Sequence, residues 1–243
     1  LLHDRELKDQ VAALRPYGEW TGRITRLDDL IKSGPGEKGT FTREELRWRQ
    51  NTVGWTIEDL ELILQPMVEE VKEATGSMGD DTPMAVLSDQ YRGLHHFFRQ
   101  NFSQVTNPPI DSLREKRVMS LVTRLGNLGN IMEEDESQLD ILQLDSPVLL
   151  NGEFEVLREH MGGTAVEIDC TFRPSDGENA LRNAIYRLQS ESEDAVRGGN
   201  KHLVLHDCCT DSEHAPVPMI LATAAVHTHL VQSRLRTFTS LNV

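Results

Sequence analysis

The apolar and polar residues form a strand–helix pattern in the last third of the chain. Residues 166–172 alternate between apolar and polar side chains and are rich in β-branched residues, which is typical of a half-buried strand. Residues 201–206 and 238–243 have strand patterns as well, and a helical pattern separates each pair of strands. This order predicts three parallel strands in one sheet, either the start of a (β/α) barrel or part of an open doubly wound sheet.

Capping residues predict where the two helices of this region begin and end. Ser-Asp-Gly-Glu at residues 175–178 has the spacing of a capping box and predicts the start of the first helix. Gly198 and Gly199 predict its end. The second helix is predicted over residues 218–236. It is apolar almost all round as far as Val226, so we expect it to be buried.

Residues 23–160 instead predict helices with irregular connections. Thr42 and Thr56 each stand three residues before an acidic side chain, Glu45 and Asp59, which is the spacing of a helix start. The fold class predicted for the whole chain is therefore α/β. Its helical N-terminal part is followed by parallel β-α-β-α-β units.

Several element boundaries in the helical part follow from single residues. Pro66 is expected to break the helix that begins near Thr56 and to open another over residues 67–74. The remaining predicted elements are a helix over residues 89–102 capped by Ser88, a strand over residues 118–125, and a short helix over residues 151–160 capped by Asn151.

Composition and charge restrict the partners of the chain. Its 243 residues carry a net charge of −14, with 38% hydrophobic and 26% charged residues. A surface this acidic repels phosphate backbones and anionic lipid, so neither nucleic acid nor a membrane is an expected partner. The three cysteines include an adjacent pair, which does not suit a disulfide framework. A charged start and the absence of a long apolar segment agree with a cytoplasmic location.

The local motifs predict no catalytic, cofactor or metal site. A G-x-G-x-x-G sequence at residues 34–39 follows a helical pattern and contains Pro35, so we interpret it as a loop. His206, Cys208, Cys209 and His214 are a dense group of potential metal ligands. However, adjacent cysteines in an extended chain point in opposite directions. The favoured interpretation is therefore a loop in which the cysteines act as small apolar side chains that fill space.

Other histidines are also expected to be structural. His227 and His229 lie about 200° apart around a helix axis and cannot share one metal. His95 and His96 are adjacent and splayed as well. The competing class is a free-standing α/β module that holds a ligand or metal on the loop of residues 207–214.

Three long segments carry a resemblance to a known family. They read GSMGDDTPMAVLS at residues 76–88, GLHHFFRQNFSQVTNPPID at residues 93–111 and REKRVMSLVTRLGNLGN at residues 114–130. Shorter similar segments lie at residues 15–20, 145–149 and 225–230. The chain thus resembles the central domain of the large subunit of glutamate synthases, and the resemblance covers essentially its whole length.

The resemblance implies a role without catalytic residues in this segment. Glutamate synthases form glutamate from glutamine and 2-oxoglutarate. An amidotransferase domain precedes the central domain, and a domain carrying FMN and a 3Fe–4S cluster follows it. The resemblance implies no cofactor in this segment. A small subunit with FAD, NADPH and 4Fe–4S clusters is the implied partner of the NADPH-dependent forms, which we favour over ferredoxin-dependent ones because residues 76–130 resemble bacterial enzymes.

The same resemblance implies domain boundaries and candidate positions along an internal ammonia path. Residues 1–22 are expected to be the connector from the amidotransferase domain, and residues 23–243 a central domain truncated at its C-terminal end. Leu1 in place of an initiator Met also suggests a piece of a longer protein. The candidate path or interface residues are Gln104, Thr106, Asn107 and Asp111, followed by Ser77, Met78, Asp80 and Asp81.

Overall fold

A parallel three-stranded sheet organises the C-terminal part of the chain. The computed structural model describes residues 3–31, 41–74, 83–89, 92–98 and 110–243. Strands β4 (Ala165–Asp169), β6 (His202–His206) and β8 (Ser240–Asn242) lie in the order β4-β6-β8 and pair in parallel. The predicted parallel arrangement of these strands is confirmed.

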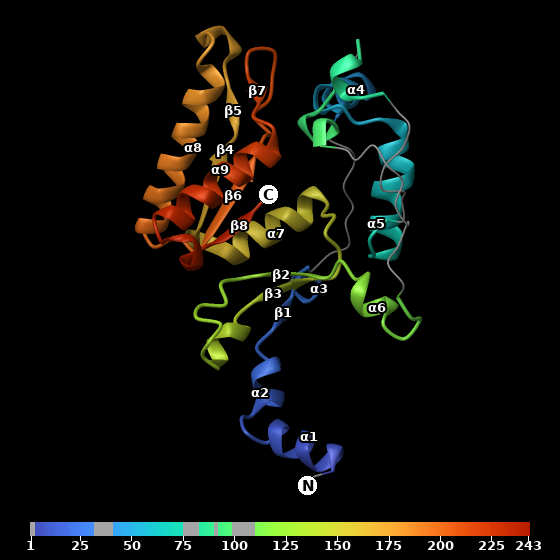
Figure 1. Cartoon of the computed structure of the whole chain (residues 1–243), viewed down its shortest axis with the longest axis vertical. Coiled ribbons are helices and arrows are strands. Elements are labelled where there is room, and N and C mark those ends of the chain that lie inside the picture. The colour runs from blue at the N-terminus through green and yellow to red at the C-terminus, as the bar shows by residue number, and fades with distance from the viewer. Residues whose placement is uncertain (1–2, 32–40, 75–82, 90–91, 99–109) are drawn as a thin grey trace.

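Helices α8 (Ala180–Arg197) and α9 (Met219–Gln232) connect these strands and pack on the sheet (Figure 1). Leu203 and Leu205 of β6 face a core that includes Leu188 and Leu230, and all four side chains are at most 2% exposed. Each such leucine contributes roughly 1.5–3 kcal/mol through burial. Leu203 and Leu205 of β6 therefore pack on α8 and α9, and the predicted packing of these two helices on the sheet is confirmed.

A second sheet covers the other face of β6. Val204 points away from Leu203 and Leu205 and packs with Leu142, Leu144, Leu157 and Met161. These residues come from α7 (Asn151–Met161) and β3 (Leu142–Leu144). β3 pairs in parallel with β1 (Thr25–Arg26) and antiparallel with β2 (Thr123–Leu125). The sequence pattern indicated only one strand in this region, because these three strands have at most three residues each.

Several predicted boundaries in the C-terminal part are wrong. The strand predicted over residues 166–172 is divided at Cys170 into β4 and the short β5 (Thr171–Phe172), which pairs antiparallel with β7 (Ala215–Pro216). Residues 175–178 do not start α8. Gly177 adopts φ 95° after a 3₁₀ turn, and the helix begins later, at Ala180. The predicted end of α8 at Gly198 and Gly199 is confirmed, with Gly199 at φ 91°.

Helix α9 is shorter than predicted and only partly buried. It ends at Gln232, and its buried face consists of Ala222, Val226 and Leu230. Ile220 and Val231 are 55% and 50% exposed, so the helix is not buried all round. α7 begins at Asn151, but its N-cap is Leu150, whose N–H donates to the Glu153 carboxylate at 2.7 Å. Asn151 is therefore the first helical residue rather than the cap.

The N-terminal part consists of separate helices (Figure 1). Helices α1 (Asp4–Ala12), α2 (Tyr17–Thr21) and α3 (Leu27–Leu30) precede α4 (Arg43–Val53). Thr42 caps α4 as predicted, because its hydroxyl accepts from the Glu45 N–H at 3.2 Å. Thr56 and Asp59 cap each other in the same way, with the Thr56 N–H donating to Asp59 at 2.8 Å and the Asp59 N–H donating to the Thr56 hydroxyl at 3.2 Å.

Pro66 does not break the helix that follows Thr56. A π-helical segment, Asp59–Leu64, runs directly into α5 (Gln65–Glu70), which carries Pro66 near its start. The wider turn before the proline accommodates its missing N–H without ending the helix. The helix instead ends where Val71 adopts φ 50°. The helix predicted over residues 67–74 therefore stops early.

The described parts of the other predicted elements also differ from the prediction. Within residues 89–102, the structure describes a 3₁₀ helix, Leu94–Phe98, rather than an α-helix. The Ser88 hydroxyl accepts from the Arg92 guanidinium at 3.2 Å. Residues 118–125 begin at the end of α6 (Glu115–Val118) and reach β2 only at Thr123. The G-x-G-x-x-G segment lies outside the described residues. No helix in the described part of the chain is long and apolar enough to cross a membrane.

Candidate functional site

Polar side chains gather where the parallel strands β4 and β6 end. Asp169 and His206 are opposite each other as the last residues of the two strands. The Cys170 N–H still donates to the His206 carbonyl at 2.8 Å, and the Cys170 carbonyl then accepts from Val217 at 2.7 Å. The chain therefore changes its pairing partner at Cys170. The carboxyl edge of a parallel sheet is the usual place for ligand sites in α/β folds.

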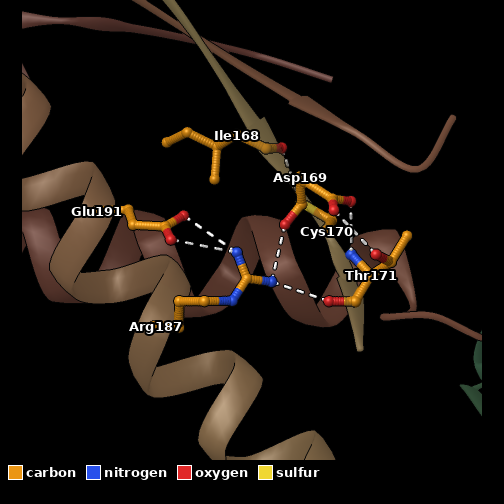
Figure 2. A network of polar contacts seen from close by, with 6 residues as sticks. All are labelled: Ile168, Asp169, Cys170, Thr171, Arg187 and Glu191. Atoms are coloured by element: carbon orange, nitrogen blue, oxygen red, sulfur yellow. Dashed lines mark hydrogen bonds and ion pairs between the residues drawn. The ribbon is translucent and has the colours of Figure 1, made fainter. Parts of the chain in front are cut away.

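Arg187 of α8 holds this change of direction (Figure 2). One terminal nitrogen of its guanidinium donates to the Asp169 carbonyl at 2.9 Å and to the Thr171 carbonyl at 2.8 Å. The other pairs with Glu191 at 3.1 Å, and the Asp169 carboxylate accepts from the Thr171 N–H and hydroxyl at 3.0 Å each. The local sequence gives no signal for Arg187, because its partners lie 16 and 18 residues earlier.

His206, Cys208 and Cys209 converge on one another. One potential ligand atom from each lies within 4.8 Å of the other two, and the Cys208 Sγ is 2.8 Å from the His206 Nδ1. A turn causes this, since the Thr210 N–H and hydroxyl both donate to the Asp207 carbonyl, at 3.0 and 2.7 Å. The expectation that adjacent cysteines point apart is wrong here because they occupy a turn rather than an extended chain.

His214 does not belong to this group. Its Nδ1 lies 2.9 Å from Asp211, and its Nε2 accepts from the Arg173 guanidinium at 2.9 Å. The four ligands grouped from the sequence thus reduce to three. His214 instead stabilises the connection between β6 and β7.

Neither Cys170 nor Cys208 has the lowered thiol pKa of an activated nucleophile. Burial raises the pKa of the Cys170 thiol to about 11. Partial burial, followed by the neighbouring Cys209, also raises the pKa of Cys208. A catalytic cysteine needs a lowered pKa, so the Cys208–His206 contact does not form a nucleophilic dyad.

The histidines on α9 have structural partners, as the sequence predicts. His229 Nε2 lies 2.6 Å from the Glu193 carboxylate of α8, and His227 Nδ1 accepts from Arg236 at 3.1 Å. Ser233 also approaches, but its hydroxyl donates to Glu193 rather than to His229. His229 and Ser233 therefore connect α9 to α8 through Glu193, His227 connects α9 to the turn at Arg236, and these groups do not form a hydroxyl–imidazole–carboxylate triad.

Of the candidate path residues, the structure describes only Asp111. Its Oδ1 accepts from the N–H groups of Leu113 and Arg114, at 3.0 Å each, and its carboxylate pairs with the Arg114 side chain at 3.4 Å. Asp111 thus fixes the start of the turn that leads into α6. Gln104, Thr106, Asn107, Ser77, Met78, Asp80 and Asp81 lie outside the described residues.

The three cysteines do not fit an iron–sulfur cluster. Cys170 is 0% exposed within the apolar core, and of the three cysteines only Cys208 and Cys209 belong to the metal-ligand group with His206. A cluster of the 3Fe–4S type requires three converging thiolates, and a neutral buried thiol does not supply the third. The carboxyl edge of β4, where a parallel sheet often binds phosphate, is occupied by the Arg187 network.

Together these features define an α/β module whose described polar groups bind one another rather than form a catalytic set. The glutamate synthase central domain model matches residues 48–243. The chain is 62% identical over 245 residues to the large chain of the NADPH glutamate synthase of Azospirillum brasilense, covering 100% of this chain and 16% of that protein. The chain belongs to the glutamate synthase central domain family.

Relatives with other electron donors share the domain. The NADH glutamate synthase of Schizosaccharomyces pombe is 37% identical, with 99% of this chain and 12% of that protein covered. The chloroplastic ferredoxin-dependent glutamate synthase of Spinacia oleracea is 37% identical, with 98% and 15% covered. The chain therefore spans at most 16% of the length of these three relatives.

Proposed function

We propose that this chain is the central, non-catalytic domain of a cytoplasmic glutamate synthase, an oxidoreductase that forms L-glutamate from glutamine and 2-oxoglutarate. In this role it holds the amidotransferase and FMN domains together and contributes to the internal ammonia path. Family membership supports the enzyme class.

The exposed apolar surface of the N-terminal helices is the observation that carries the linking role. α4, the π-helical segment and α5 contain no buried residue. Large apolar side chains remain exposed in and beside these helices and in the 3₁₀ helix Leu94–Phe98: Ile57 is 65% exposed, Leu62 64%, Ile63 47% and Phe98 74%. Apolar surface on this scale marks an interface. Its proposed occupants are the neighbouring domains of the same polypeptide.

The chemistry of the proposed parent enzyme lies on other domains. The amidotransferase domain releases ammonia, and the domain with FMN and the 3Fe–4S cluster carries out the reduction. NADPH is the favoured electron donor, because the relative at 62% identity is an NADPH enzyme. A small subunit with FAD and 4Fe–4S clusters is then a further partner.

A central domain placed between these two sites is well situated to wall an ammonia path. Ammonia that escapes into bulk water is diluted and protonated, so transfer between separated sites requires enclosure. Thr106 and Asn107 offer hydrogen-bonding groups to a neutral polar guest, and Pro108 and Pro109 restrict the backbone beside them. Asp111 anchors the end of this segment through its bonds to Leu113 and Arg114. Residues 104–111 are therefore the proposed wall or gate.

The test is a Thr106→Phe substitution in the full-length enzyme, with Thr106→Ser as the matched control. The bulky ring obstructs the path without contacting either reacting centre. We expect glutamine hydrolysis to continue while glutamate formation from glutamine falls and ammonia appears in solution. Thr106→Ser keeps the hydroxyl and is expected to stay coupled. A correctly folded Thr106→Phe enzyme that makes glutamate at the full rate without ammonia release would refute the proposed path.

A further inference from the structure

His206, Cys208 and Cys209 have the composition of a soft-metal site. Imidazole nitrogen and thiolate sulfur are the ligands that Zn²⁺ prefers in proteins. The three ligand atoms already lie within 4.8 Å of one another. In a tetrahedral zinc site, two sulfur ligands lie about 3.8 Å apart, as follows from Zn–S bonds of about 2.3 Å. The upper limit of 4.8 Å between the ligand atoms is about 1 Å above this spacing, and the two exposed cysteine side chains have room to rotate.

The backbone prepares this arrangement before any metal binds. His206 is held by the sheet, because its carbonyl accepts from Cys170 and its position is paired with Asp169 of β4. Cys208 and Cys209 are held by the turn between Asp207 and Thr210. Both cysteines are free thiols with exposed side chains, so an ion reaches them from solvent.

A pocket beside Cys208 leaves room for a fourth ligand. Asp207, Cys208 and Thr210 form one wall, and residues of α4, including Trp48 and Arg49, form the other. The pocket has a volume of about 320 Å³. Three protein ligands with an open fourth position are the pattern of zinc sites that bind water or a substrate group.

We propose that the imidazole of His206 and the thiolates of Cys208 and Cys209 bind one Zn²⁺ ion, with the fourth position open to the pocket beside α4. Binding replaces the Cys208 thiol contact with His206 Nδ1 by two bonds to the metal. Both thiols lose their protons to solvent, so two S–H bonds break and two Zn–S bonds form without any change of oxidation state.

Zinc titration of the reduced, metal-free 243-residue chain tests this site. We expect one Zn²⁺ per chain in competition with a chromophoric chelator, with release of protons at neutral pH. Co²⁺ used as a spectroscopic probe is expected to give thiolate charge-transfer and tetrahedral d–d bands. Cys208→Ser, Cys209→Ser and His206→Gln should each weaken zinc binding by more than about 100-fold, because losing an outer-shell partner alone costs about 10–100-fold.

Two matched variants control for the other thiol and the neighbouring imidazole. Cys170→Ala removes the core thiol, and His214→Gln removes the imidazole that contacts Asp211 and Arg173. Both are expected to bind zinc like the unmodified chain. Circular dichroism without metal verifies the fold of every variant. Zinc binding no stronger than in a Cys208→Ser/Cys209→Ser double variant overturns the site, as does unchanged affinity in a folded His206→Gln variant.

Discussion

Replacing Arg187 by methionine should loosen the junction between β4 and β5. The substitution keeps an unbranched side chain of similar length but removes the guanidinium. It therefore deletes the two bonds to the carbonyls of Asp169 and Thr171, at 2.9 and 2.8 Å, and the ion pair with Glu191 (Figure 2). The strand change at Cys170 then relies on its backbone bonds alone.

The stability lost in the Arg187→Met variant depends on how far these contacts are exposed to water. A hydrogen bond to a charged group contributes about 1.5–3 kcal/mol when it is buried. The Arg187 side chain is 37% exposed, so water partly replaces the lost donor, and we reduce the sum for two bonds by about half. The exposed pair with Glu191 adds at most about 0.5 kcal/mol. The free energy of unfolding should fall by about 1.5–3.5 kcal/mol.

Urea unfolding followed by circular dichroism measures this change. The free energy of unfolding of such a protein falls by about 2–3 kcal/mol per molar urea, so the urea concentration at the unfolding midpoint should decrease by about 1 M. Glu191→Gln removes only the ion pair and should shift the midpoint little. Arg182→Met is the matched control, because Arg182 lies exposed on the same helix and has no hydrogen bond or ion pair among the described residues. Equal losses in Arg187→Met and Glu191→Gln would refute the role of the two carbonyl bonds.

Three further predictions concern the core, the pH response and the isolated chain. Leu188→Ala should lower the free energy of unfolding, measured by chemical denaturation, by about 2–5 kcal/mol, because Leu188 is 0% exposed. Tyr186→Ala, at a 61% exposed position, should change it by at most about 0.5 kcal/mol. Equal effects of the two substitutions would contradict the observed packing. Arg197, and then His229, hold the pKa of Glu193 below its ordinary value of 4.5. The Glu193 carboxylate therefore stabilises the fold above pH 4.5, and this contribution is lost as the pH falls through the lowered pKa. Glu193→Gln should flatten the acid side of the stability profile measured by urea unfolding, and an unchanged profile would argue against this role. The purified chain should bind neither FMN nor iron and should turn over neither glutamine nor 2-oxoglutarate; a flavin spectrum after reconstitution, or glutaminase activity above background, would overturn this.

The parallel sheet could be predicted because its information is local. Residues of β4 alternate between apolar and polar side chains, β6 is a short apolar run, and the apolar face of α8 repeats with helical spacing. Arg187 could not be predicted, because its role depends on a change of strand pairing at Cys170 that no local pattern encodes. Gly177 likewise delayed the start of α8 by adopting a positive φ despite a capping-box sequence at residues 175–178.

The candidate metal ligands were likewise only partly predictable from the sequence. The sequence identified His206, Cys208 and Cys209 as potential ligands, but the turn after Asp207 determines that they converge. His214 was included through proximity in sequence and is held elsewhere by Asp211 and Arg173. The short strands β1, β2 and β3 form through long-range pairing, which two or three residues cannot indicate on their own.

Isotope transfer in the full-length enzyme tests the central claim most directly. Glutamine labelled with heavy nitrogen in its amide group is supplied together with an excess of unlabelled ammonia, and mass spectrometry measures the label in the newly formed glutamate. If the central domain encloses the path, the enzyme should transfer the label almost undiluted, and Thr106→Phe should dilute it toward the isotopic composition of the solution. Undiluted label in a folded Thr106→Phe enzyme at an unchanged rate of glutamate formation would contradict a path along residues 104–111.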